Sequence, residues 1–94
     1  MRAIFFEELQ EMMRNDSSLF FLTGDTGFHL VESIFEEFPH RSLNVGVAEQ
    51  NMIGIASGLV NAGFVPVCYA ITNFLIERCF EQIRNDICLH EYKI

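Results

Sequence analysis

The fold is decided by residues 43–69, which read LNVGVAEQNMIGIASGLVNAGFVPVCY. Residues 43–47 are predicted to form a strand, and residues 48–62 a helix that ends at Gly63, a residue type favoured just after a helix C-terminus. The β-prone residues 64–69 predict the next strand. A strand, a helix and a strand in this order are typical of a parallel sheet with connecting helices.

The same region contains an uncharged run of 27 residues, from Gln50 to Ile76. A membrane helix requires about 20 apolar residues, so the run is long enough for one. Asn61, Gly63 and Pro66 interrupt it, however, and favour two shorter elements. We therefore expect a buried helix followed by a buried strand, both covered on several sides, and no membrane span.

The flanking residues extend this alternation of helices and strands. Further helices are predicted over residues 2–14, 28–38 and 73–89, with strands over residues 19–23 and at residues 91–94, where a strand begins. The apolar positions that give the first and the last of these helices their periodicity are Ile4, Phe5, Leu9, Met12 and Met13, and Phe80, Ile83 and Ile87. The sequence therefore predicts an α/β fold, with a mostly parallel sheet and helices on both faces.

The composition indicates one small globular domain over residues 1–94. The chain is 50% hydrophobic and 20% charged, whereas disordered chains combine low hydrophobicity with high charge. Its 6 Lys and Arg residues against 13 Asp and Glu residues give a net charge of -7, so nucleic acid is an unfavourable partner. Because three or four strands are few for a sheet of this class, we expect an incomplete domain, either a fragment or a subunit.

The cysteines and histidines indicate neither a disulfide framework nor a metal site. Cys68, Cys79 and Cys88 are odd in number, lack the CxxC spacing and lie in apolar stretches, so we expect reduced core thiols in a cytoplasmic protein. The first residues of the chain also lack the apolar segment of a secretory signal. The histidines, which lie far apart in the sequence and are expected at the surface, are His29, His40 and His90.

Glu49, Gln50 and Asn51 stand where the strand of residues 43–47 passes into the next helix. In open α/β sheets, ligands bind at the carboxyl ends of strands and at the helix N-termini that follow. A glutamate in a first helical turn can simply complement the positive end of the helix. Beside the long uncharged run, Glu49 is also expected to be shielded from water, which suits a carboxyl group that contacts a ligand. Both interpretations stay open on these residues alone.

Two blocks of the sequence form a recognisable pair. The first is Asn44 to Met52 with the helix of small residues after it, and the second is Phe74 and Arg78 followed by residues 81–85, EQIRN. Together they resemble the pyrimidine-binding domain of transketolases and their thiamine-diphosphate-dependent relatives. The chain looks closest to the C-terminal subunit of split transketolases. The resemblance implies transfer of a two-carbon ketol unit between sugar phosphates, and the related activities of deoxyxylulose-phosphate synthases and 2-oxo-acid dehydrogenase β subunits are the alternatives.

The resemblance implies roles for three residues. Glu49 matches the glutamate that bonds N1′ of the aminopyrimidine of thiamine diphosphate, which stabilises the imino tautomer that accepts the C2 proton of the thiazolium. Phe74 matches the aromatic residue that stacks on the pyrimidine, although Ile71 stands where transketolases often carry a second aromatic residue. Asp25 matches an acid near the site and the subunit interface, with an Asx-type turn as the alternative.

The diphosphate half of the cofactor site is expected on another chain or domain. Gly24-Asp25-Thr26 departs from the Gly-Asp-Gly motif of thiamine enzymes, so we expect no metal site here. Mg²⁺ would be held by a diphosphate-binding partner in a homo- or hetero-oligomer. Small residues of the central helix would let another helix or a cofactor approach, or would pack within the chain; they are Gly54, Ser57 and Gly58. Residues expected at the interface or near a substrate phosphate, with a solvated helix face as the alternative, are Arg78, Arg84 and Gln82.

Two functions of other classes are also considered. A non-catalytic assembly module would use the same surface without binding the cofactor. A nucleotide-binding domain of the Rossmann type would use Gly24 to Gly27 as its phosphate loop, but no GxGxxG pattern follows the first predicted strand. The nucleotide-binding domain is therefore disfavoured, and the assembly module remains the alternative.

Overall fold

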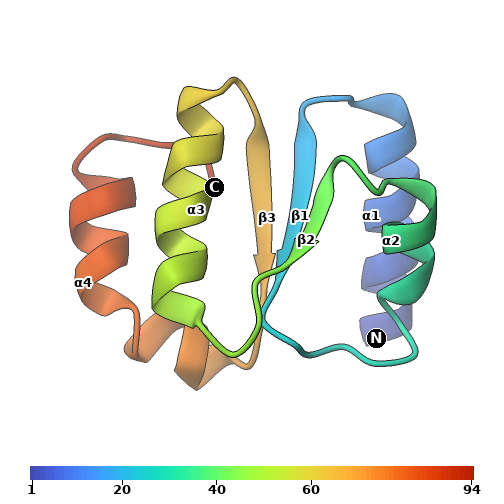
Figure 1. Cartoon of the computed structure of the whole chain (residues 1–94), viewed down its shortest axis with the longest axis horizontal. Helices are drawn as coiled ribbons and strands as arrows, with labels where there is room; N and C mark the ends of the chain where they lie inside the picture. Colours follow the sequence, from blue (N-terminus) through green and yellow to red (C-terminus); the bar gives the residue numbers. More distant parts are fainter.

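Three parallel strands form the centre of the computed structural model, which describes all 94 residues (Figure 1). β1 (Leu19–Thr23) lies between β2 (Ser42–Asn44) and β3 (Val65–Tyr69), in the order β2-β1-β3. Phe21 of β1 is in register with Ser42 on one side and with Val67 on the other. The predicted α/β class and the parallel sheet are confirmed.

One face of the sheet is covered by α1 (Arg2–Asn15) and α2 (Glu32–Glu37) (Figure 1). The core on this face comprises Phe6, Leu9, Met13, Leu19, Phe21, Val31 and Ile34. The residues that α1 contributes to it are spaced three and four apart, as on one side of a helix. Ile4, Phe5 and Met12, which were assigned to the apolar positions of this helix, are exposed because they fall outside that stripe. Phe6 is buried in their place.

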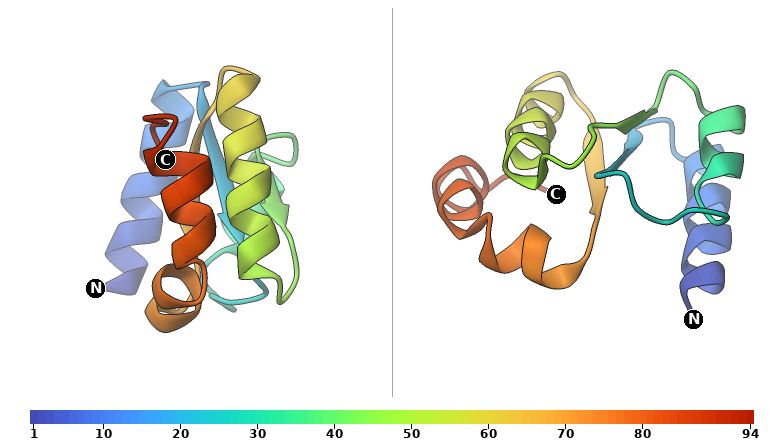
Figure 2. Two further views of the ribbon diagram at one scale, coloured as in Figure 1. Left: turned by 90° about the vertical axis from the view of Figure 1, so that its left-hand side faces the viewer. Right: turned by 60° about the horizontal axis from the view of Figure 1, so that its bottom comes forward.

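The opposite face is covered by α3 (Glu49–Asn61), whose Met52 packs against Leu22 of β1. Outside α3 lies a further helical layer, formed by α4 (Phe80–Gln82) and the π-helical segment η2 (Ile83–Cys88), as Figures 1 and 2 show. Helices therefore lie on both faces of the sheet, as predicted. The buried residues of α3 are Glu49, Met52, Ile53 and Ala56. Only one side of this helix is thus buried, and β3, which lies at an edge of the sheet, is fully buried only at Pro66. The prediction of a helix and a strand covered on several sides was therefore wrong.

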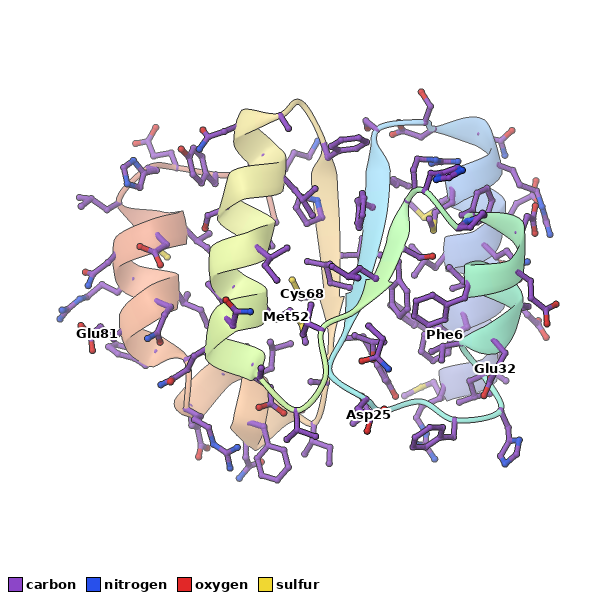
Figure 3. All side chains as sticks on the ribbon, viewed as in Figure 1. Phe6, Asp25, Glu32, Met52, Cys68 and Glu81 are labelled. Carbon is purple, nitrogen blue, oxygen red and sulfur yellow. The ribbon has the colours of Figure 1, made fainter.

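The helix predicted over residues 28–38 is shorter in the structure. It begins only at Glu32, because Gly27 and His29 have positive φ angles, 85° and 68°, which a right-handed helix does not contain. The Oε1 atom of Glu32 accepts a hydrogen bond from the His29 N–H at 2.9 Å. The acid, labelled in Figure 3, therefore closes the turn that precedes α2.

The helix predicted over residues 73–89 is divided into three short segments, of which η1 (Asn73–Glu77) is the first. The N–H of Arg78 donates to the carbonyl of Asn73, five residues back, at 3.1 Å. This wider spacing breaks the expected period of three and four, and Phe80, assigned to the apolar positions, is 64% exposed. Segments of this π type are found frequently at functional sites.

Two predicted strands also differ from the structure. The strand predicted over residues 43–47 ends at Asn44, because the side chain of Asn44 accepts a hydrogen bond from the Gly46 N–H at 2.9 Å and turns the chain. Residues 91–94 form no strand. Glu91 has a positive φ of 57° there, which is incompatible with extended backbone.

The cysteines are free thiols, as expected. Cys79 is buried and Cys68 is half-buried, but Cys88 is exposed and the prediction of a core position was wrong for it. Cys88 ends η2, in the outermost helical layer, where the rest of the chain does not cover it. The three histidines are exposed, as predicted. None of the helices has both the length and the apolar character that crossing a membrane requires.

Candidate functional site

The loops that follow the three strands meet at one edge of the sheet, at the bottom of Figure 1. The loop after β1 leads to α2 on one face, whereas the loop after the neighbouring β3 leads to η1 on the side of α3 (Figures 1 and 2). Neighbouring strands whose connections leave to opposite faces create a crevice, and open α/β sheets bind ligands in such a crevice. This edge therefore has the geometry of a ligand site.

A pocket of about 340 Å³ opens at this crevice between the loops after β1 and β3. Its lining includes Arg2, Asp25, Thr26, Tyr69 and Ile71. The structure thus brings Asp25 and Ile71, two positions singled out in the sequence, to one pocket. Small-molecule sites are typically concavities of this kind, at about 300–1,000 Å³.

Asn44 joins the loops that follow β1 and β2. Its Oδ1 accepts hydrogen bonds from the N–H groups of Asp25 and Gly46, each at 2.9 Å, and its Nδ2 donates to Asp25 Oδ1 at 3.2 Å. Asp25 has a positive φ of 58°, a conformation that aspartate adopts more readily than most residues. The Asp25 carboxyl therefore bonds to a neighbouring strand end instead of closing its own loop. Asn44 was not among the predicted site residues, although its place at a strand end, at the start of the first sequence block, was a usable signal.

Glu49 is the buried carboxyl group of this edge. It is the first residue of α3, and its side chain is only 4% exposed, so its predicted burial is confirmed. The loop after β1 packs closely against it: a Cβ added at Gly24 would lie 3.7 Å from Glu49 Oε1 and 3.2 Å from the carbonyl oxygen of Gly46. A carboxylate with so little contact with water requires compensation by a nearby cation or by hydrogen bonds.

Arg78 provides a cation at this point. Its Nη1 lies 3.7 Å from Oε2 of Glu49, and its guanidinium carbon lies 4.3 Å from the centroid of the Phe74 ring. One guanidinium therefore contacts both the carboxylate and the aromatic face. Glu49, Phe74 and Arg78 come from the two separate sequence blocks, and the fold brings them into one cluster.

Two cysteines lie close to this cluster. Cys79 is fully buried, and its thiol donates a hydrogen bond to the Phe74 carbonyl at 3.3 Å. Burial raises the pKa of Cys79, the charge of Glu49 raises it further, and Arg78 opposes both effects. The pKa of Cys68 is raised to about 12, mainly by burial and to a lesser extent by the nearby Cys79. Because the thiolate is the nucleophilic form, both cysteines serve as packing residues here.

Two of the predicted interface residues lie apart from the cluster. Arg84 is exposed, and its side chain donates a hydrogen bond to Asn85 Oδ1 at 3.2 Å. Gln82 is half-buried in α4, and its Oε1 has no hydrogen-bond partner. No hydrogen bond or ion pair connects either residue to Glu49. Of the three residues in that group, only Arg78 joins the candidate site.

One side of α3 is open. A Cβ added at Gly54 or Gly58 would meet no atom within 4 Å, so there is room for another group beside both glycines. Ser57 packs within the chain instead, with its Oγ 3.0 Å from the Ile53 carbonyl and 3.3 Å from the Asp86 carbonyl. Gly54 and Gly58 thus leave room for another helix or a cofactor, whereas Ser57 packs within the chain.

Comparison with known proteins agrees with this fold and with the sequence blocks. Residues 1–94 match the family described as the transketolase pyrimidine binding domain. A 1-deoxy-D-xylulose-5-phosphate synthase of Halalkalibacterium halodurans is 35% identical over 87 residues, which cover 92% of this chain and 14% of that protein. An apulose-4-phosphate transketolase subunit of Actinobacillus succinogenes is 39% identical over 64 residues, covering 68% of this chain and 21% of that protein.

A solved structure is also similar over nearly the whole chain. It is described as a split gene transketolase, inactive beta4 tetramer, and superimposes with a TM-score of 0.86 at 33% sequence identity. The match covers 98% of this chain and 31% of that one. The chain therefore spans less than a third of the length of this protein, and 14% and 21% of the two relatives above.

Proposed function

Because the chain belongs to the transketolase pyrimidine-binding domain family, we propose that it forms the pyrimidine-binding half of a thiamine-diphosphate site. A partner subunit or domain completes that site, and the assembly transfers a two-carbon ketol unit between sugar phosphates. When bound, thiamine diphosphate supplies the nucleophilic carbon that attacks the carbonyl group of the ketose. The residues of this chain bind the pyrimidine ring and orient it.

The observation that carries this proposal is that one planar group contacts both Glu49 and Phe74. The guanidinium of Arg78 does so at 3.7 Å from the carboxylate and 4.3 Å from the ring centroid. A planar ring stacked on Phe74 therefore has the Glu49 carboxyl within reach of its edge. Glu49 would bond the ring nitrogen N1′, and stacking on Phe74 would contribute about 0.5–1.5 kcal/mol beyond the buried area.

Asp25 is assigned to the rim of the same edge, in a pocket whose lining includes neither Glu49 nor Phe74. It lines the pocket between the loops after β1 and β3, and its two hydrogen bonds to Asn44 fix its position. An acid held at this edge can accept a hydrogen bond from the cofactor or from a partner residue. Asn44 is then a positioning residue for Asp25.

The diphosphate and its Mg²⁺ are assigned to a cytoplasmic partner subunit. No group of three or more His, Cys, Asp or Glu side chains in this chain could hold a metal ion, and the net charge of -7 repels a diphosphate. One relative is named as a subunit of a transketolase, and the split gene transketolase is described as an inactive beta4 tetramer. Both names support an enzyme with more than one kind of subunit, in which Arg84 and Gln82 contribute to the interface.

The test is ketol transfer by the chain assembled with the diphosphate-binding subunit of its own organism. Glu49→Gln keeps the shape of the side chain and removes its charge. We expect the rate to fall about 100- to 10,000-fold, the range of a general acid–base contribution. Glu36→Gln changes an exposed acid outside the site and serves as the matched control with an unchanged rate. Equal rates for Glu49→Gln and the wild type would exclude the assigned role of Glu49.

A non-catalytic assembly module is the second candidate. Each loop at this edge carries one exposed apolar side chain: Phe28, Val47 and Ile71. Exposed apolar groups on neighbouring loops favour a protein interface. Calorimetric titration separates the two functions, because an assembly module would bind the partner without any site for thiamine diphosphate, whereas the proposed enzyme binds both.

A further inference from the structure

Arg78 is the exposed member of the cluster at the edge of the sheet. Its side chain is 51% exposed, whereas that of Glu49 is 4% exposed. Its guanidinium lies 3.7 Å from the Glu49 carboxylate and 4.3 Å from the centroid of the Phe74 ring. Building on the function proposed above, we propose that this guanidinium competes with the aminopyrimidine ring for the face of Phe74 and leaves that face when the ring binds.

The guanidinium and an aminopyrimidine share the features that suit a group placed between Phe74 and Glu49. Both are planar, both carry N–H donors, and both stack on aromatic faces. Stacked aromatic rings have centroids about 4.5–7 Å apart. The guanidinium carbon, at 4.3 Å from the Phe74 centroid, therefore fills the volume that a ring stacked on this face needs. The two groups cannot occupy that face together.

The backbone of Arg78 is fixed, while its guanidinium is weakly held. The Arg78 N–H donates to the Asn73 carbonyl at 3.1 Å, and the Arg78 carbonyl accepts a hydrogen bond from Gln50 Nε2 at 3.1 Å. The separation of 3.7 Å from Glu49 is longer than a hydrogen bond of about 2.7–3.2 Å. Displacement of the side chain therefore breaks one ion pair and one cation–π contact, and it leaves the backbone in place.

Arg78 also compensates the charge of Glu49, because its Nη1 lies 3.7 Å from the Glu49 carboxylate. A buried carboxylate left without its cation is strongly destabilising. Removal of the guanidinium therefore destabilises the empty chain and at the same time frees the face of Phe74. An arginine that only supports the fold would lower both stability and affinity when it is removed. Removal of an arginine that the ligand displaces lowers stability but raises affinity.

The test combines thermal unfolding of the empty chain with calorimetric titration by 4-amino-5-hydroxymethyl-2-methylpyrimidine. For Arg78→Ala we expect a lower unfolding temperature and an affinity about 2- to 30-fold higher than that of the wild type, from loss of the competing cation–π contact. Arg78→Lys keeps a cation near Glu49 but lacks a planar group, so it is expected to stay folded and still bind more tightly than the wild type. Lys93→Ala removes an exposed cation outside the site and is expected to leave the affinity unchanged.

A second measurement follows the side chain directly. The Nε–Hε resonance of Arg78, shifted by the Phe74 ring in the empty chain, is expected to move to the position of an exposed arginine when the pyrimidine is added. Binding of the pyrimidine that is lost in Phe74→Ala supports the proposed function. If, in addition, both Arg78 variants bind the pyrimidine no more tightly than the wild type, the displacement of Arg78 is overturned and the proposed function stands. If the pyrimidine binds neither the wild type nor either Arg78 variant, the pyrimidine site and this inference both fail.

Discussion

Replacing Asn44 by alanine is expected to loosen the edge of the sheet at which the candidate site lies. The Asn44 amide makes three hydrogen bonds, at 2.9 Å to the N–H of Asp25, at 2.9 Å to the N–H of Gly46 and at 3.2 Å to Asp25 Oδ1. These bonds join the end of β1 to the loop that leads into α3. The substitution removes all three bonds at once and leaves the backbone of β2 unchanged.

The size of the effect follows from these bonds. A hydrogen bond contributes about 0.5–1.5 kcal/mol to stability, and all three bonds are exposed, which favours the lower end of that range. Three bonds then amount to about 1.5 kcal/mol. In a domain of about 60–100 residues, 1 kcal/mol corresponds to about 4–8 °C in Tm, so Asn44→Ala is expected to lower the Tm by about 6–12 °C.

Thermal unfolding followed by circular dichroism measures this change. Asn51→Ala is the matched control, because Asn51 is exposed on α3 and alanine favours a helix. Its Tm is expected to equal that of the wild type or to exceed it slightly. A Tm for Asn44→Ala within about 2 °C of the wild type would refute a stabilising bridge, because even one exposed hydrogen bond corresponds to about that much.

The remaining predictions concern the thiols and one ion pair. Iodoacetamide at about pH 8 is expected to modify the exposed Cys88 first and to modify Cys68 and Cys79 only after unfolding, because burial raises the pKa of both thiols. Peptide mass spectrometry gives the order, and equal rates would contradict it. Arg14 donates hydrogen bonds to the Glu37 carboxylate at 2.5 and 2.9 Å, and these bonds hold the pKa of Glu37 below its usual 4.5. A carboxyl group whose pKa is lowered by folding stabilises the fold at pH values above its usual pKa. This stabilisation is lost as the pH falls through the lowered pKa. The Tm advantage of the wild type over Glu37→Gln is therefore expected to be constant above about pH 6 and to disappear in acid, and an advantage that grows in acid would contradict the assignment.

The parts of the fold that could be predicted are those that local patterns encode. The strand predicted over residues 19–23 has the same bounds in the structure, because a short apolar run between turn residues is a local signal. The end of α3 just before Gly63, which has a φ of 95°, is another. The start of α2 depends on the positive φ of His29, and the break between η1 and α4 depends on how Cys79 bonds to the Phe74 carbonyl. No pattern in the neighbouring residues predicts the start of α2 or this break.

The candidate site could be predicted only in part for the same reason. The burial of Glu49 followed from the uncharged run after it. Phe74 and Arg78 are four residues apart, a spacing that brings side chains together on a helix, so their contact was also accessible from the sequence. Their contact with Glu49 was not, because it depends on the path that η1 takes beneath α3. Asn44 lay within the recognised block, but its bonds to Asp25 become evident only when the ends of β1 and β2 lie side by side.

Asn44 and Arg78 both stabilise this edge, yet they are expected to have opposite effects on pyrimidine affinity. Loss of the Asn44 amide lets the loop that carries Asp25 and the loop that leads to Glu49 move. A smaller fraction of molecules then has the binding geometry, and the affinity falls by that fraction. Loss of the Arg78 guanidinium frees the face of Phe74, and the affinity rises. If affinity followed stability alone, both variants would bind more weakly than the wild type. The direction of the affinity change in Arg78→Ala therefore shows whether Arg78 blocks the face of Phe74 or only supports the fold. The double variant is expected to bind the pyrimidine with an affinity between those of the two single variants.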